Sequence, residues 1–374
     1  MEKVFAFGKP VNGELFTDRE TETKKLLANF THGINTFVLS PRRWGKTSLV
    51  KKVAGLAASS QLKIVYMDIL HCKTKEDFLQ VFGTAILSQT SGKIEEVLNT
   101  AKKVLSRVSL DVSFSPDVTQ PFTFKFRMSD DDTNTEEILS LPETIGTKKN
   151  IDIVVCIDEF QQISRFDQTD RFQAELRGIW QHQQRVSYCL FGSRKSAMEG
   201  LFDDTSKPFY KFGDIMYLKT IPLSYWTPYI QGKFEAVKKS ISSDFCEKVC
   251  ETVEYNSSYV QQLSWYILQN TETEVTEQIF NDSVNELVDQ CSDVFETKTQ
   301  DLPVYQMRLL RAISDGNKEG LFGKQIIREY KLGSSANVTI ARKALLEKNL
   351  VEIDNGSLTL SDPVMNLWLH RLFG

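Results

Sequence analysis

The sequence is poor in the residues that build metal sites and disulfides. It has four histidines and six cysteines among 374 residues, and no two cysteines form a C-x-x-C pair. The histidines lack the spacing of metal ligands, which argues against a zinc site. Cys156 and Cys189 lie inside apolar, strand-like runs, so we expect reduced and mostly buried thiols, as in a cytosolic protein. The residues concerned are His32, His71, His182 and His370, with Cys72, Cys156, Cys189, Cys246, Cys250 and Cys291.

Long apolar runs are also missing. No stretch approaches the ~18 apolar residues that suggest a membrane span, and the opening MEKVFAFGKPVNGELF lacks a basic segment followed by an apolar one. The net charge of -4 and the pI near 5.8 give no whole-chain basic field that would attract nucleic acid or a membrane surface. We therefore expect a cytoplasmic protein that is neither exported nor inserted into a membrane.

What the sequence does contain is the pattern of an α/β domain. A chain of 374 residues is long enough for two or three domains. Over roughly the first 220 residues, four short runs rich in β-branched and aromatic residues alternate with longer segments of helical periodicity. The runs are NTFVL, LKIVYMDI, IDIVVCID and VSYCLFGS. This alternation predicts a parallel sheet flanked by helices.

An interruption of a different kind separates the second and third runs. The segments LDVSF and FTFKF alternate apolar and polar residues on either side of a turn that contains proline and aspartate. This pattern predicts an exposed β-hairpin insert at about residues 108–130. A helix is expected to follow from Asn134.

Two prolines interrupt the pattern around IPLSYWTPYI, and we expect a domain boundary at Pro222 to Pro228. The segment that follows is helical in character to about Thr299, with acidic stretches and apolar positions at helical spacing.

The last part of the chain has the pattern of a winged helix. Three helical segments, PVYQMRLLRAI, FGKQIIREY and SSANVTIARKALLEKNL, precede a predicted hairpin LVEIDNGSLTLS that turns at Asn355 and Gly356. The predicted domains are an α/β core at residues 1–223, a helical lid at residues 224–299 and a winged helix at residues 300–374.

The stretch SPRRWGKTS resembles a phosphate-binding P-loop, which reads G-x-x-x-x-G-K-[ST]. Gly45, Lys46 and Thr47 match the last three positions of this motif. Gly45 lets the backbone approach the phosphates closely, Lys46 supplies an ammonium for phosphate, and Thr47 supplies a hydroxyl for magnesium. Ser40 replaces the first glycine, and because Pro41 follows, it takes extended angles that serine adopts without strain. We therefore expect Ser40→Gly to change little. The expected nucleotide-binding residues are Pro41, Arg42, Arg43, Trp44, Gly45, Lys46, Thr47 and Ser48.

An acidic pair supports the P-loop interpretation. The run IDIVVCIDEF is a predicted buried strand that ends in Asp158 and Glu159. In this arrangement one carboxylate holds magnesium and the next activates the attacking water. The strand VSYCLFGS ends in Ser193, whose hydroxyl could contact the γ-phosphate or the water; alone, a serine at a strand end is more often a turn former.

The chain resembles the archaeal-type P-loop ATPases, a branch of the AAA-like and STAND NTPases. The likeness is carried by LFTDRE, SPRRWGKTSLV, VVCIDEFQ, FGSRKSAMEGLF, PFYKFGDIMYLKTIPL and LSDPVMNLWLHRLF, which occur in the family's order. The resemblance implies a P-loop NTPase of the ASCE type, a slow ATPase with ATP and Mg²⁺ as cofactors. The implied roles are Phe16 and Arg19 near the adenine, Lys46 and Thr47 at phosphate and magnesium, Asp158 and Glu159 as the Walker B pair, and Ser193 with Arg194 at the γ-phosphate.

The family comparison leaves one charge unassigned. Many relatives have LYGR where this chain has FYKF, residues 209–212. Several cations could complete the γ-phosphate site, and each could equally be a solvated surface charge. They are Arg42, Arg43, Arg194, Lys195 and Lys211.

Three functions fit the sequence. The first is an ATP-driven switch or motor that acts on the winged helix. The second is a DNA-binding regulator gated by nucleotide, because residues 301–349 hold nine Lys/Arg against five Asp/Glu and the third helix ends in Arg342, Lys343 and Lys348. The third is a scaffold that recruits a protein partner, with FTFKFRM as a docking edge. Expected partners are ATP and ADP, weakly bound duplex DNA, and a protein partner or a second copy of the chain.

Overall fold

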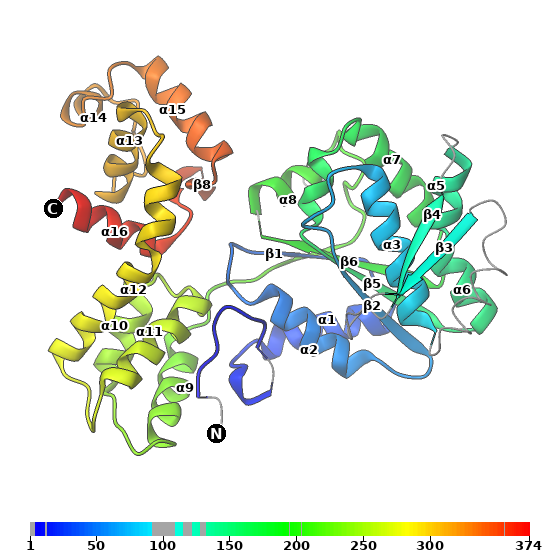
Figure 1. The fold of residues 1–374 in the computed structure, drawn as a ribbon, viewed down its shortest axis with the longest axis horizontal. Helices are drawn as coiled ribbons and strands as arrows, with labels where there is room; N and C mark the ends of the chain where they lie inside the picture. Colours follow the sequence, from blue (N-terminus) through cyan, green and yellow to red (C-terminus); the bar gives the residue numbers. More distant parts are fainter. Residues whose placement is uncertain are drawn as a thin grey trace. The chain divides into compact units, whose positions relative to one another are not determined.

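The computed structural model describes residues 4–11, 13–91, 109–114, 122–127, 132–193, 195–202, 204–354 and 356–374. The chain divides into two compact units (Figure 1). The core unit comprises Arg19–Pro41 and Lys46–Lys219, and the C-terminal unit comprises Met1–Asp18, Arg42–Gly45 and Thr220–Gly374.

The core unit is built on a five-stranded parallel sheet with the order β2-β5-β6-β1-β7. The four predicted apolar runs form four of its strands, and β6 separates the P-loop strand β1 from the acidic strand β5, which is the predicted ASCE arrangement. The fifth strand, β7, was not predicted because DIMY is short and only one of its residues is buried. The strands are β1 (Thr36–Leu39), β2 (Leu62–Asp68), β5 (Asp152–Asp158), β6 (Val186–Gly192) and β7 (Asp214–Tyr217).

Helices cover both faces of this sheet. In Figure 1, α1 and α2 lie on one side, and α3, α7 and α8 lie on the other. Alternate strand residues face opposite sides, so Phe37 and Leu39 join the apolar cluster that also contains Phe78 and Phe82 of α3. The helices are α1 (Glu20–Thr31), α2 (Lys46–Ala57), α3 (Lys75–Thr90), α5 (Asp132–Leu139), α6 (Leu141–Lys149), α7 (Thr169–Trp180) and α8 (Lys195–Phe202), with the 3₁₀ helix η2 (Phe160–Arg165).

The predicted hairpin insert is present. Strands β3 (Ser109–Phe114) and β4 (Phe122–Arg127) pair antiparallel, with Ser109 opposite Arg127 and Phe114 opposite Phe122. The residues that join them lie outside the described part of the chain. The role of this hairpin as a docking edge stays a prediction.

The C-terminal unit contains helices and one hairpin. Its helical part is α9 (Leu223–Glu235), α10 (Ser243–Thr252), α11 (Ser257–Asn270) and α12 (Glu277–Thr299), and a short 3₁₀ helix η1 (Gly13–Leu15) lies in its N-terminal segment. The winged helix follows as α13 (Val304–Ser314), α14 (Lys324–Glu329), α15 (Ser335–Glu347), the strands β8 (Val351–Asp354) and β9 (Ser357–Leu360), and α16 (Pro363–Phe373). Helix α16 closes the winged helix and was not predicted as an element.

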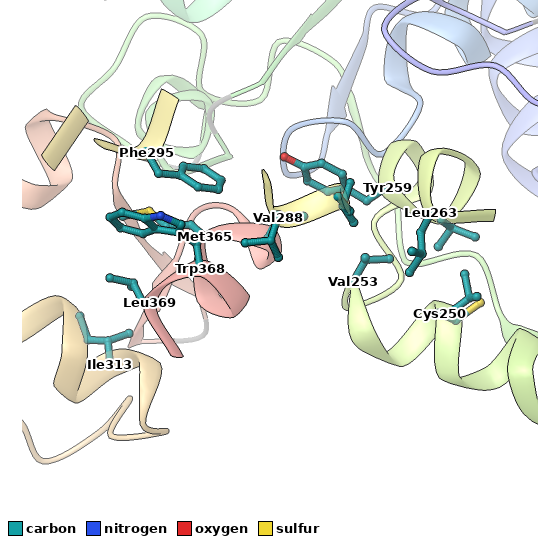
Figure 2. Packing of buried hydrophobic residues seen from close by; sticks show 14 of the residues in the cluster. Cys250, Val253, Tyr259, Leu263, Val288, Phe295, Ile313, Met365, Trp368 and Leu369 are labelled. Atoms are coloured by element: carbon teal, nitrogen blue, oxygen red, sulfur yellow. The ribbon is translucent and has the colours of Figure 1, made fainter. Parts of the chain in front are cut away.

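One apolar cluster runs through the helices of the C-terminal unit and its winged helix. Figure 2 shows part of it, with Phe295 of α12 beside Trp368 of α16; their ring centroids are 5.8 Å apart. Met365 and Leu369 of α16 lie on the same side of that helix and are buried. Burial of these side chains fixes α16 against α12.

The two units divide at Lys219 and Thr220, close to the boundary expected at Pro222 to Pro228, but Pro228 does not interrupt the helix that begins there. Pro222 is the N-cap of α9 and Pro228 lies inside this helix. A proline there removes one backbone hydrogen bond, but Trp226, Ile230 and Phe234 bury one face of α9 at a spacing of four residues. Packing of this face outweighs the missing bond.

We predict that Pro228→Ala stabilises the C-terminal unit. The proline is exposed, so little packing is lost, and alanine restores an N–H that can donate within the helix. The free energy of unfolding should rise by about 2 kcal/mol, after allowance for the greater freedom of the unfolded chain. Urea unfolding of the intact chain measures it. Pro363→Ala is the matched control, because Pro363 is the first residue of α16, where proline is favourable. If Pro228→Ala does not raise the free energy of unfolding above the value for Pro363→Ala, the explanation is wrong.

Candidate functional site

The P-loop begins where β1 ends in the interior of the sheet. All four residues of β1 are buried, and α2 begins at Lys46. Gly45 has a φ of +87°, a left-handed conformation that side chains rarely adopt, so the backbone requires glycine here. Arg43 also has a positive φ, 65°. A non-glycine residue in this region carries strain, and such residues gather at functional sites.

The ammonium of Lys46 is held inside the loop. Its Nζ donates to the carbonyl oxygens of Ser40 at 2.9 Å and Pro41 at 2.7 Å, and to Ser40 Oγ at 3.1 Å. Both Lys46 and Ser40 are buried, and a buried ammonium needs such oxygen partners. The Ser40 hydroxyl therefore contacts the P-loop lysine, a contact that the sequence did not indicate.

Asp158 accepts hydrogen bonds from the P-loop helix and from β2. Thr47 Oγ1 donates to Asp158 Oδ2 at 2.9 Å, and the Tyr66 hydroxyl donates to the same oxygen at 2.6 Å. The backbone N–H of Glu159 donates to Asp158 Oδ1 at 2.9 Å. Asp158 ends β5 in register with Asp68 of β2, so these groups meet at the carboxyl edge of the sheet.

Burial controls the ionisation of this carboxyl group. Asp158 is 6% exposed, and desolvation raises its pKa above the usual range, while the hydrogen bonds from Tyr66 and Thr47 act in the opposite direction. The burial of Tyr66 and the nearby charge of Asp158 raise the pKa of the Tyr66 phenol, which therefore stays a donor.

Glu159 lies beside Asp158 but is held by different groups. Its Oε2 accepts a hydrogen bond from Ser193 Oγ at 2.9 Å and another from Gln161 Nε2. Strands β1 and β6 pair in parallel with Leu39 opposite Gly192, so Ser193 follows β6 at the edge where the P-loop follows β1. Glu159 itself has a φ of 56°, a second left-handed residue at this edge.

Within the C-terminal unit, the P-loop segment Arg42–Gly45 contacts α11 and the N-cap of α16. The Arg43 guanidinium donates to the Tyr259 hydroxyl and lies 3.5 Å from Asp362 Oδ2, to which Tyr259 donates at 2.7 Å. The backbone carbonyl of Arg43 accepts from the Ser258 N–H at 3.3 Å. Asp362 also caps α16 through its other oxygen, so one carboxylate joins the P-loop arginine to the start of the last helix.

The other predicted site residues are dispersed. Phe16 lies in the C-terminal unit and Arg19 in the core unit, where Arg19 is buried and paired with Glu22 at 3.0 Å. Among the candidate cations, Lys211 is exposed and lies 5.3 Å from the centroid of the Tyr210 ring. Arg194 lies outside the described residues.

The remaining predicted residues belong to the P-loop and its surroundings. Arg42 is exposed and its carbonyl accepts from Asn256 Nδ2 at 3.3 Å. Trp44 is half-buried, Ser48 is buried in the first turn of α2, and Lys195 begins α8.

Four residues with notable contacts were not assigned by the sequence: Tyr66 and Gln161 in the core unit, and Tyr259 and Asp362 in the C-terminal unit. Tyr66 and Tyr259 are aromatic residues in apolar surroundings, where a core role is the usual interpretation. Gln161 and Asp362 belong to the segments VVCIDEFQ and LSDPVMNLWLHRLF, which were noted for resemblance alone.

Structural metal sites and membrane helices are not found in the part of the chain that the structure describes. There, no three His, Cys, Asp or Glu side chains gather as they would around a metal ion. The six cysteines are free and five of them are buried, as expected. No helix of the described segments is both long enough and apolar enough to cross a membrane.

Comparison with known families covers most of the chain. A model of the family described as "ATPase domain predominantly from Archaea" matches residues 16–263. A second model, of a "probable winged helix domain", matches residues 293–371. No curated protein matches the chain.

Solved structures share the fold over almost the whole length. The Walker-type ATPase paby2304 of Pyrococcus abyssi is 16% identical with a TM-score of 0.68, over 98% of this chain and 100% of that one. The Aeropyrum pernix ORC2 protein, solved in ADPNP-ADP complexes, is 14% identical with a TM-score of 0.61, over 99% and 96%. The Aeropyrum pernix ORC1 protein, solved in complex with DNA, is 13% identical with a TM-score of 0.50, over 96% of each chain.

We predict that Asp158→Asn stabilises the nucleotide-free protein at neutral pH. Because burial raises the folded-state pKa of Asp158, the wild type loses stability as pH rises through that value, whereas below the ordinary aspartate range the carboxyl is protonated in both states. Asparagine keeps an oxygen for Thr47 and Tyr66 without the charge; its amide nitrogen then faces the Glu159 N–H, and the loss of that one hydrogen bond offsets part of the gain at every pH. The gain in unfolding midpoint should therefore shrink on acidification. The exposed Asp167→Asn is the control, and an equal gain there, or a gain that grows at low pH, would refute the argument.

Proposed function

Because the chain belongs to the family of ATPase domains found predominantly in Archaea, we propose that it is a Mg²⁺-dependent, ATP-hydrolysing molecular switch or motor. One observation supports this most directly. The hydroxyls of Thr47 and Ser193 donate to the two carboxylates at the end of β5, Asp158 and Glu159. P-loop, acidic pair and the end of β6 thus meet at the carboxyl edge of a parallel sheet, where such folds bind ligands.

Phosphate binding is assigned to the P-loop and the start of α2. Backbone N–H groups after Pro41 and the N-terminus of α2 supply donors and a positive partial charge. The Lys46 ammonium supplies the full charge. Its partners, Ser40 and Pro41, contribute mainly backbone oxygens, which place the amine at the loop rather than in bulk solvent.

The residues present fit a magnesium ion. Thr47 Oγ1 and Asp158 Oδ2 are 2.9 Å apart, and both are oxygen ligands of the kind that Mg²⁺ prefers. Thr47 would bind the ion directly and Asp158 directly or through water. When bound, Mg²⁺ neutralises charge on the β- and γ-phosphates. Tyr66 keeps the carboxylate of Asp158 in place by its hydrogen bond to Oδ2.

Glu159 is the proposed general base. A water oxygen attacks the γ-phosphorus, the bond from that phosphorus to the oxygen bridging to ADP breaks, and Glu159 takes the proton that the water loses. The products are ADP and inorganic phosphate. Ser193 holds one oxygen of Glu159, and Arg194, Phe16 and Arg19 keep their proposed roles at the γ-phosphate and the adenine.

The switch is proposed to act through Arg43. In the C-terminal unit, this P-loop residue shares Asp362 with Tyr259, and Asp362 caps the last helix of the winged helix. A nucleotide that alters the P-loop backbone would change the position of Arg43 relative to these partners. Such a two-state contact is the kind of element that a ligand can bias.

We expect Glu159→Gln to lower ATP turnover by ~10² or more while keeping nucleotide affinity, because the amide preserves the shape but cannot take a proton.

Lys46→Ala should abolish nucleotide binding, since it removes the charge that neutralises the phosphates. Steady-state phosphate release and binding of a fluorescent ATP analogue measure the two effects. Ser40→Gly removes one hydroxyl partner of Lys46 but keeps both carbonyl partners, so this variant should bind and turn over nearly as the wild type. Equal turnover in wild type and Glu159→Gln would exclude the assigned base.

A second function, duplex DNA binding, is favoured by the charge on the winged helix. Lys324, Arg328 and Lys331 line a surface hollow that ends at Ser334 and Ser335, the N-terminus of α15. These three cations are exposed, as are Lys343 and Lys348, and none of them takes part in an ion pair among the described residues. Lys and Arg side chains with a helix N-terminus suit phosphate oxygens. The DNA complex of the structurally similar ORC1 protein is consistent with this proposal.

We expect weak, salt-sensitive duplex binding whose two basic sets contribute separately. Replacing Arg342, Lys343 and Lys348 with Gln, or Lys324, Arg328 and Lys331 with Gln, should reduce the slope of log K against log salt by about 0.9 for each lost phosphate contact. ATP binding should stay unchanged. The charge-matched control replaces the exposed Lys24, Lys73 and Lys238.

The experiment measures fluorescence anisotropy of a labelled duplex over a salt series, with ATP and with ADP. An absence of binding at ~50 mM salt would exclude DNA as a partner. A slope that changes as much in the control as in either basic set would show that binding is not located on the winged helix.

A further inference from the structure

Gln161 is a buried amide in the turn that follows the acidic pair. It is 6% exposed and lies in η2, two residues after Glu159. Its Nε2 donates to Glu159 Oε2, the same oxygen that accepts from Ser193 Oγ at 2.9 Å. Two donors from different elements, the η2 turn and the residue after β6, therefore meet at one oxygen of this carboxylate.

Gly192 leaves the space that the Gln161 amide occupies. A Cβ built on Gly192 would come within 1.8 Å of Gln161 Oε1 and 2.9 Å of its Cδ. Gly192 does not have a left-handed φ, so its backbone conformation would accept a side chain. The requirement for glycine at the end of β6 is therefore steric, and it comes from Gln161.

The burial of the Gln161 amide does not stabilise the folded state. Gln161 Oε1 is buried with no hydrogen-bond partner among the described residues, which is unfavourable for the folded state. An apolar residue of the same volume would fill the site without that cost. The hydrogen bond that the amide does make in the structure is the one to Glu159.

We propose that Gln161 is a positioning residue for Glu159, and that Gly192 exists to admit it; this inference rests on the proposed ATP hydrolysis. Gln161 and Ser193 fix Oε2, so Glu159 presents its other oxygen, Oε1, to the attacking water. Glu159, Gln161 and Ser193 all belong to the core unit. Orientation of this kind matters because small misplacements of a catalytic group are costly to the rate.

The test is a cycle of variants measured for kcat and KM in ATP hydrolysis. Gln161→Met keeps the volume without the donor, and we expect kcat to fall roughly tenfold or more with KM nearly unchanged. Gly192→Ala should cause a similar loss, because its Cβ displaces the amide. Combined with Gln161→Ala, which leaves room for that Cβ, Gly192→Ala should cause no further loss.

Gln161→Glu separates positioning from a merely structural role. A carboxyl group at this place can donate to Glu159 only when it is protonated, so kcat relative to wild type should recover as the pH is lowered. Thermal unfolding of each variant checks the fold, and Gln161→Met should be at least as stable as the wild type because it removes an unsatisfied buried oxygen.

The outcomes distinguish this inference from the proposed function. If Glu159→Gln is inactive while Gln161→Met hydrolyses ATP at the wild-type rate, the positioning role is overturned and the ATPase stands. An additional loss from Gly192→Ala in the Gln161→Ala background would also overturn it. If the wild type hydrolyses no ATP, or Glu159→Gln is as fast as the wild type, the proposed function fails and this inference fails with it.

Discussion

The hydrogen bonds on Asp158 connect the three sequence segments on which the site depends. The donors are the Thr47 hydroxyl of the P-loop helix, the Tyr66 hydroxyl of β2, and the backbone N–H of Glu159 in the turn after β5. They meet because the strands are parallel and their carboxyl ends share one edge of the sheet. This carboxylate therefore links the P-loop helix to the acidic strand through a polar contact.

The same edge concentrates features that are unfavourable for folding. Lys46 and Asp158 are buried charges, and Glu159 has a left-handed backbone. Charge burial and such conformations each cost free energy unless the surroundings compensate. In this protein the compensation comes from backbone carbonyls, hydroxyls and the half-buried phenol of Tyr66. Departures from folding rules that gather at one place are typical of a functional site.

Much of the fold could be predicted because its signals are local. The buried strands are continuous apolar runs; the P-loop segment begins where β1 ends, and the acidic pair lies at the end of β5. Strand β7 and helix α16 were missed, the first because an edge strand of four residues has little pattern. Pro228 was expected to interrupt the helical pattern, because proline usually ends a helix. It lies inside α9 because the buried face of this helix holds the helix together.

The contacts within the site could be predicted only in part. That Asp158 would lie near the P-loop follows from strand order, which the motif implies. That Tyr66 would share its oxygen with Thr47, or that Gln161 would reach Glu159 past Gly192, depends on side-chain directions and on the space left by a missing Cβ. Such information lies in the packing of segments distant in sequence, not in any one of them.

The central claim is that ATP with Mg²⁺ binds where Lys46, Thr47 and Asp158 converge. A crystal structure of the Glu159→Gln protein soaked with ATP and Mg²⁺ tests it most directly. We expect density for the β- and γ-phosphates at Lys46 Nζ, and for a metal ion bound by Thr47 Oγ1 next to Asp158. Nucleotide bound away from the P-loop, or phosphates at the loop with the metal ion remote from Thr47 and Asp158, would contradict it.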